Sequence, residues 1–263
     1  MDEVNYPSVI QGLLESAYHA RPEVSKSMLD KINRSPKLYW HAYIEKDLPP
    51  YSSDAMMMGS CVHLMLLEPN RAGEIAVRPK VDRRTKAGKE AYAAWYEEFG
   101  SAELILDEDQ YEHATRAVEA VKCHKLASKL LEQAHSYEAS MFAKDEETGL
   151  ALRGRADIIL KNGSLVDLKT TRDATPRGFR SSMYKFRYDV QAAYYVDLAR
   201  RCGYDSERFF FIAVEPNPPY PVAVYWASPY TLEQGRLQYR ENLNLLARCL
   251  EDDHWPDFQG AEL

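Results

Sequence analysis

The spacing of hydrophobic positions changes along the chain, and the first half follows a helical period. Ser25 and Ser35 stand where helix N-caps are expected, since a serine side chain can accept a bond from a free N–H of the first turn. Pro36 suits a first turn, where the missing proline N–H is not needed. A third helix is predicted over residues 54–67 and ends before Pro69.

One face of the predicted helix 54–67 carries an apolar stripe. At a period of 3.6 residues, Met56, Gly59 or Ser60, His63 and Leu67 lie above one another. His63 is therefore expected to point inward with this stripe. An inward histidine is more often a core residue than a ligand, and both interpretations stay open at this point.

Two further helical stretches precede the middle of the chain. Alanine, glutamate, lysine and leucine dominate residues 86–99 and 109–134, with Gly100 as a stop signal and Asp107 or Asp109 as an N-cap. We expect these helices to form an arm or flank of the main body.

From residue 136 the pattern becomes that of short strands. Asp-Glu-Glu-Thr-Gly and Lys-Asn-Gly, which both favour tight turns, separate the first three. Strands are predicted at 136–143, 150–160, 164–170, 208–214 and 222–226, and helices at 177–186, 189–202 and 231–250. A meander followed by a helical crossover predicts a fold that mixes helices and strands, α/β in the broad sense and α+β in the antiparallel pairing of its meander. Its mixed central sheet would be flanked by helices and preceded by an N-terminal helical region.

The composition is that of a globular protein able to build a core. The chain has 263 residues, of which 45% are hydrophobic and 28% charged. Without an internal repeat or a long linker, we expect one domain over 1–263, mostly helical up to about 134 and with the sheet core from about 135. The acidic start lacks an apolar region, and stretches such as 209–214 fall short of the ~20 residues of a membrane span, so a cytoplasmic location is expected.

The net charge of −7 argues against a nonspecific coat on nucleic acid, which needs an excess of cations. Locally the balance reverses, because residues 169–187 carry six lysines and arginines against the single acid Asp173, and residues 78–89 are similarly basic. A solvated face is the simpler explanation of each segment taken alone.

The four cysteines are scattered, without the close pairs of zinc or iron-sulfur sites, and are expected to be reduced structural thiols.

Two acids and a lysine fall on neighbouring predicted strands. Asp157 lies on the second strand of the meander, and Asp167 and Lys169 share one face of the third, with Leu168 turned to the opposite face. They could be surface acids with a lysine as ion-pair partner. Their apolar neighbours instead indicate buried strands, where clustered carboxylates are costly unless a hard cation such as Mg²⁺ or Mn²⁺ binds them. Such a site could catalyse phosphodiester hydrolysis.

These residues belong to an ordered set of motifs that resembles the PD-(D/E)xK nuclease superfamily, RecB-type branch. The motifs are Gly154-x-x-Asp157, Asp167-x-Lys169-Thr170-Thr171 and Gln191-x-x-x-Tyr195. Upstream segments resemble the RecE-like (exonuclease VIII) family: Ser25-x-Ser27, Ser35-Pro36, Gly59-Ser60-x-x-His63 and Leu66-Leu67-Glu68-Pro69. The resemblance spans about residues 24–255 and is weakest over 86–134.

The resemblance implies a role for each matching residue. Asp157, Asp167, the backbone carbonyl of Leu168 and His63 would be metal ligands, and Lys169 would orient the attacking water. Glu138, on the first strand of the meander, would be a ligand or support one.

Further positions are expected to contact DNA. Gln191 and Tyr195 lie one helical turn apart and could hold a DNA phosphate or support the lysine, although an ordinary amphipathic helix explains their spacing equally well. The basic segment after the lysine would meet the DNA backbone. Its proposed DNA-binding residues are Arg172, Arg177, Arg180 and Lys185.

The implied activity is that of a Mg²⁺-dependent exonuclease, with Mn²⁺ able to substitute. It would act on double-stranded DNA ends in the 5′ to 3′ direction, leave 3′ single strands for phage-type recombination, work with a RecT-like annealing protein and form a ring-like homo-oligomer such as a tetramer. No iron-sulfur cluster is expected, because only Cys202 and Cys249 follow the core. The alternatives are a structure-selective endonuclease or Cas4-like DNA end processor, and a catalytically silent DNA-binding subunit.

Overall fold

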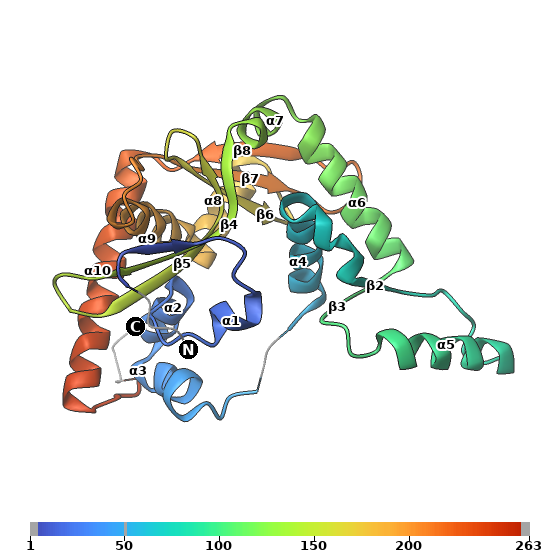
Figure 1. The fold of residues 1–263 in the computed structure, drawn as a ribbon, viewed down its shortest axis with the longest axis horizontal. Coiled ribbons are helices and arrows are strands. Elements are labelled where there is room, and N and C mark those ends of the chain that lie inside the picture. The colour runs from blue at the N-terminus through green and yellow to red at the C-terminus, as the bar shows by residue number, and fades with distance from the viewer. Residues whose placement is uncertain (1–4, 50–51, 259–263) are drawn as a thin grey trace.

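Six strands form the main sheet of the computed structural model, which describes residues 5–49 and 52–258 (Figure 1). The spatial order is β1-β4-β5-β6-β7-β8. The strands span Ser8–Ile10 (β1), Ala134–Lys144 (β4), Ala151–Leu160 (β5), Leu165–Thr170 (β6), Phe209–Val214 (β7) and Val222–Trp226 (β8). β6 and β7 are parallel and the other neighbours antiparallel, so the predicted mixed sheet with a β4–β6 meander is confirmed.

The turn between β5 and β6 shows why the meander is tight. Gly163 has φ +80°, a left-handed conformation that glycine adopts without strain. A Cβ at this position would lie 2.6 Å from the carbonyl oxygen of Asp205, so close packing also requires glycine. The predicted Lys-Asn-Gly turn is therefore present. β1 was not predicted, because three residues are too few to show an alternating pattern.

The helices begin and end largely where the sequence predicts. Their bounds are Glu15–His19 (α1), Lys26–Arg34 (α2), Pro36–Tyr39 (α3), Asp54–Leu67 (α4), Lys86–Phe99 (α5), Glu108–Cys123 (α6), Lys125–Glu132 (α7), Pro176–Phe186 (α8), Tyr188–Arg201 (α9) and Pro229–Asp252 (α10). Ser25 and Ser35 accept bonds from backbone N–H groups of α2 and α3, as expected of N-caps. Among residues 5–49 and 52–258, no helix is long and apolar enough to cross a membrane.

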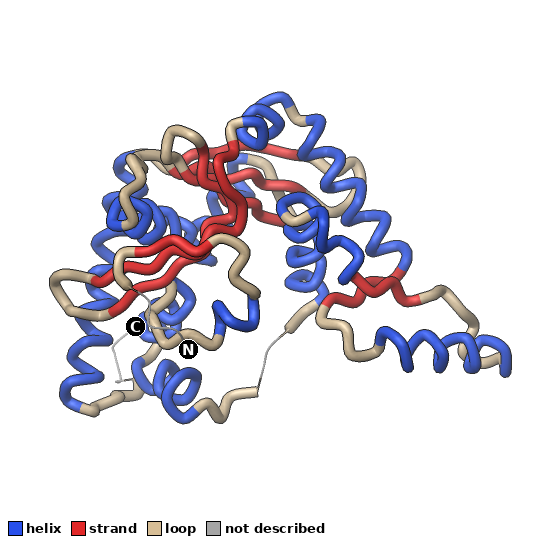
Figure 2. Tube along the Cα trace, in the orientation of Figure 1, coloured by secondary structure: helices blue, strands red, loops and turns tan. Residues whose placement is uncertain are grey.

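Helices cover both faces of the main sheet (Figures 1 and 2). On one face, α2, α9 and α10 pack around buried residues that include Leu165 of β6. On the other, α4 and α6 pack around a second cluster that includes Val166 and Leu168. Side chains alternate along β6, so Leu168 points into the core on the α4 and α6 face, as predicted. Asp167 and Lys169 point to the other face, toward α9.

The region between α4 and β4 differs most from prediction. β2 (Ile75–Arg78) and β3 (Leu104–Asp107), which were not predicted, form a separate parallel pair, and α5 projects from the body (Figure 1). The helix expected over 109–134 is two helices, because His124 leaves the helical conformation and caps α7 through its ring nitrogen. α6 is also no outlying arm, since its apolar side is buried in the second cluster.

Candidate active site

The two aspartates meet where β5 and β6 separate. The register of these strands ends at the pair Ile158 and Val166, so Asp157 and Asp167 occupy the next position of each strand. Asp157 Oδ2 accepts a hydrogen bond from the backbone N–H of Leu168 at 2.8 Å. Adjacent buried strands thus bring both carboxylates together, as predicted.

Asp167 is 4% exposed and held by two side chains. Gln191 of α9 donates a hydrogen bond to its Oδ1 at 2.6 Å, and Lys169 Nζ lies 2.7 Å from its Oδ2. Burial raises the pKa of Asp167 to about 6, with Asp157 adding to the rise and Lys169 opposing it. Gln191 therefore contacts the aspartate directly, and it reaches the lysine only through Asp167.

Lys169 is enclosed between a carboxylate and an aromatic ring. Its ammonium lies 4.9 Å from the centroid of the Tyr188 ring, within range of a cation–π interaction. Burial lowers the pKa of Lys169, but Asp167 and Asp157 together outweigh burial and leave that pKa raised. The lysine is thus a fixed positive charge beside the aspartates.

His63 reaches the same part of β6 from α4. Its Nε2 lies 2.6 Å from the carbonyl oxygen of Leu168, and because a carbonyl only accepts, Nε2 carries the proton. The other ring nitrogen, Nδ1, lies 3.5 Å from Asp157 Oδ2. The face of α4 that carries His63 was expected in the core, but Ser60 and Met56 on it are exposed; this face lines a cavity instead.

Glu138 completes the group from β4. The β4–β5 register pairs Tyr137 with Ile158 and Ala139 with Ala156, which places Glu138 opposite Asp157. Its backbone has φ +48°, a left-handed conformation that is unfavourable for glutamate and typical of functional sites. Burial, together with the charges of Asp157 and Glu68, raises the pKa of Glu138 to about 9.

The group has the donors that a divalent cation requires. His63, Glu138 and Asp157 each offer a ligand atom, and these atoms lie within 4.8 Å of one another. With Nε2 protonated, a neutral His63 turns the Nδ1 lone pair toward Asp157, so two acceptors face each other and need a proton or a cation between them. Asp167 Oδ2 is buried without a hydrogen bond of normal geometry, despite the nearby lysine ammonium. Its carboxylate chemistry suits a hard cation.

Comparisons with known proteins identify the family of this chain. The model of a PDDEXK-like domain of unknown function (DUF3799) matches residues 25–262. The chain belongs to this family. No curated protein matches it. Among solved structures, a protein of Eubacterium rectale provisionally named an exonuclease has a TM-score of 0.67 at 14% identity, covering 94% of this chain and 90% of that one, and shares the fold. SSO0001, also at 14% identity, covers 84% of this chain and 85% of its own, with a TM-score of 0.32.

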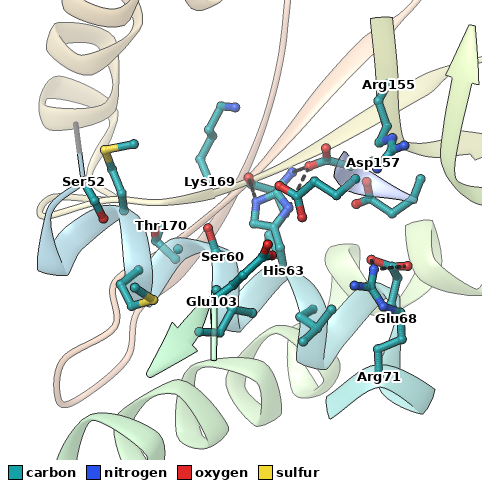
Figure 3. A pocket seen from close by; sticks show the side chains of 18 of the residues that line it. Ser52, Ser60, His63, Glu68, Arg71, Glu103, Arg155, Asp157, Lys169 and Thr170 are labelled. Atoms are coloured by element: carbon teal, nitrogen blue, oxygen red, sulfur yellow. Dashed lines mark hydrogen bonds and ion pairs between the residues drawn. The ribbon is translucent and has the colours of Figure 1, made fainter. Parts of the chain in front are cut away.

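The site of this PDDEXK-like domain opens into a cavity of about 960 Å³. α1, α4 and the strands β4–β6 line it, with the side chains of His63 and Asp157 directed toward each other (Figure 3). Lys169 lines the same cavity, but its ammonium turns toward Asp167 and Tyr188. Tyr195 of α9 also lines it and packs near Gly154, where a Cβ would lie 2.8 Å from Leu198. The small residue of the Gly154-x-x-Asp157 motif thus lets α9 approach β5.

The predicted DNA-binding cations lie outside this cavity. In the part of the chain that the structure describes, these side chains are exposed and form no ion pair, and none lines the cavity. They are Arg172, Arg177, Arg180 and Lys185. The structure therefore leaves them free for a polyanion but places them on α8 and the loop before it, beside the site rather than in it.

Two residues at the site were not predicted. Tyr188 lies three positions before Gln191 on α9, so the helical period could have placed it on the same face. Arg155 lies within the Gly154-x-x-Asp157 motif and lines the cavity (Figure 3). Strand alternation places Arg155 on the same face as Asp157, and this signal was available from the sequence.

Proposed function

We propose that this PDDEXK-like domain is a Mg²⁺-dependent DNA exonuclease of the RecE-like kind. It degrades linear duplex DNA, in the 5′ to 3′ direction, and leaves 3′ single strands for recombination by strand annealing. The observation that carries the proposal is the grouping of Asp157, Asp167, Lys169 and His63, where β5 and β6 separate, beside a large cavity. The provisional name of the Eubacterium rectale protein with this fold supports an exonuclease over other nucleases.

The chain's own residues supply the positions for the chemistry. Asp157, Asp167, the Leu168 carbonyl and His63 would hold the cation, with Glu138 as a further ligand or a support for one. A bound divalent cation would polarise a phosphoryl oxygen and lower the pKa of a water. Lys169 Nζ, fixed by Asp167 and Tyr188, would orient that water.

The hydrogen bond between His63 and Leu168 constrains this arrangement. Binding of the cation through Nε2 would require this bond of 2.6 Å to open, whereas binding through Nδ1 would leave it in place. Because Nδ1 lies 3.5 Å from Asp157 Oδ2, we expect Nδ1 to be the ligand atom and the bond between His63 and Leu168 to persist.

The wider biology rests on the resemblance to RecE-like nucleases. We propose a single nuclease domain in the cytoplasm, assembled as a ring-like homo-oligomer and working with a RecT-like annealing protein. An exposed row of cations on α8 would receive the DNA backbone.

The deciding experiment is digestion of linear duplex DNA labelled at one end of one strand at a time, alongside covalently closed circular DNA. We expect Mg²⁺-dependent loss of nucleotides from 5′ ends, intact circles, and no activity in EDTA. Nicked circles would instead indicate a structure-selective endonuclease or a Cas4-like end processor. Binding without any cleavage would indicate a catalytically silent subunit and contradict the proposal.

A further inference from the structure

Arg155 differs from the other cationic side chains of the cavity wall. Within the described ranges, each of the others has a carboxylate within 4 Å: His19 has Glu15, His63 has Asp157, Arg71 has Glu68 and Glu74, and Lys169 has Asp167. In the same ranges Arg155 forms no ion pair. Its charge acts on Glu138 and Glu15 of the same cavity only at longer range, so no carboxylate occupies the guanidinium directly.

Neutral groups hold the Arg155 guanidinium in place. Its Nε donates to Ser140 Oγ at 3.0 Å and its Nη2 donates to the carbonyl oxygen of Leu13 at 2.7 Å. The guanidinium also lies 4.5 Å from the centroid of the Tyr18 ring. Nη1 has no hydrogen-bond partner among the described residues and is not fully buried, and Arg155 lines the cavity.

The position of Arg155 suits the backbone of a nucleic acid. Arg155 and Asp157 are two residues apart on β5 and share one face, a separation of roughly 6.6 Å along the strand. Neighbouring phosphates of one nucleic-acid strand are spaced comparably. A phosphate at the cation held by Asp157 would thus place the next phosphate near the Arg155 guanidinium.

We propose that Arg155 binds the phosphate adjacent to the one that is cleaved. This inference rests on the proposed nuclease function and adds a substrate contact to it. An arginine fixed before the substrate arrives loses little side-chain entropy on binding, and its planar group matches phosphate oxygens. Its existing bonds tie β5 to β4 and to the segment before α1, so a purely structural role is the competing explanation.

A salt titration of binding separates the two explanations. The Lys169→Ala protein, which should bind duplex without turnover, is the parent, and fluorescence anisotropy gives Kd for a labelled linear duplex with Mg²⁺ at several KCl concentrations. Adding Arg155→Gln should raise Kd roughly 10-fold and reduce the slope of log affinity against log salt by about 0.9, the value for one lost phosphate contact. Arg155→Lys should keep the slope.

Two controls make the result decisive. Arg116→Gln on α6, which removes the same charge away from the cavity, should leave Kd within two-fold of the parent. Thermal unfolding checks that each variant is folded. An Arg155→Gln slope equal to that of the parent, or the same slope loss in Arg155→Lys, would overturn the role of Arg155. Failure of the parent itself to bind any DNA would overturn the proposed function, and the phosphate contact with it.

Discussion

Replacing Gln191 by leucine tests whether Asp167 must be held for catalysis. Leucine keeps much of the volume but removes the donor that lies 2.6 Å from Asp167 Oδ1. A hydrogen bond to a charged group contributes about 1.5–3 kcal/mol, and about 1.4 kcal/mol corresponds to ten-fold in rate. If the bond acts fully in the transition state, kcat/KM for duplex degradation should fall roughly 10- to 100-fold.

Gln238 on α10 provides a matched control for this change. Its side chain donates to Asp189 at 3.0 Å, and Asp189 is 7% exposed against 4% for Asp167. Gln238→Leu should therefore lower the unfolding temperature about as much as Gln191→Leu while leaving steady-state kcat/KM unchanged. Equal loss of activity in both variants, or no loss in Gln191→Leu, would refute the reasoning.

Three further predictions follow from the same geometry. Because burial raises the pKa of Glu138 to about 9 from 4.5, the metal-free protein holds a proton that the unfolded chain releases, so its stability should fall as pH rises from about 4.5 to 9. Glu138→Gln should flatten this profile in thermal unfolding with EDTA; a wild-type profile already as flat would contradict the assignment. His63→Ala should weaken cation binding at least 10-fold in calorimetry, and an unchanged affinity would exclude His63 as a ligand. Arg177→Gln combined with Arg180→Gln should reduce the salt slope of DNA binding by up to about 1.8 without changing kcat; an unaltered slope would remove these residues from the DNA path.

Local signals explain how much of the fold the sequence predicts. Serine caps mark the starts of α2 and α3, Pro69 and a continuous helical period indicate the extent of α4, and the turn with Gly163 defines the meander. β2 and β3 are each four residues long, too short to show an alternating pattern of apolar and polar residues. Their partners are also far apart in sequence, since Ile75 pairs with Leu104, 29 residues later. The break at His124 lacks a glycine or proline and depends on a side-chain cap.

The sequence predicts the part of the site that lies on neighbouring strands, but not the contacts made by distant elements. Alternation along β6 places Asp167 and Lys169 together, and adjacency of β5 and β6 adds Asp157. The partner of Gln191, the approach of His63 to Leu168 and the left-handed backbone of Glu138 depend on how α9, α4 and β4 pack. Spacing within one element cannot supply contacts between elements distant in sequence.

The most direct test of a metal-dependent nuclease centred on Asp157, Asp167 and Lys169 is the rate of linear duplex degradation with Mg²⁺ by two variants. Asp167→Ala and Lys169→Met should each lower kcat by roughly 10²- to 10⁴-fold, the range expected for loss of a group that acts on the reacting atoms. Lys161→Met, at an exposed turn lysine, should match the wild type. Degradation by the Asp167 and Lys169 variants at the wild-type rate would contradict the assignment of the site.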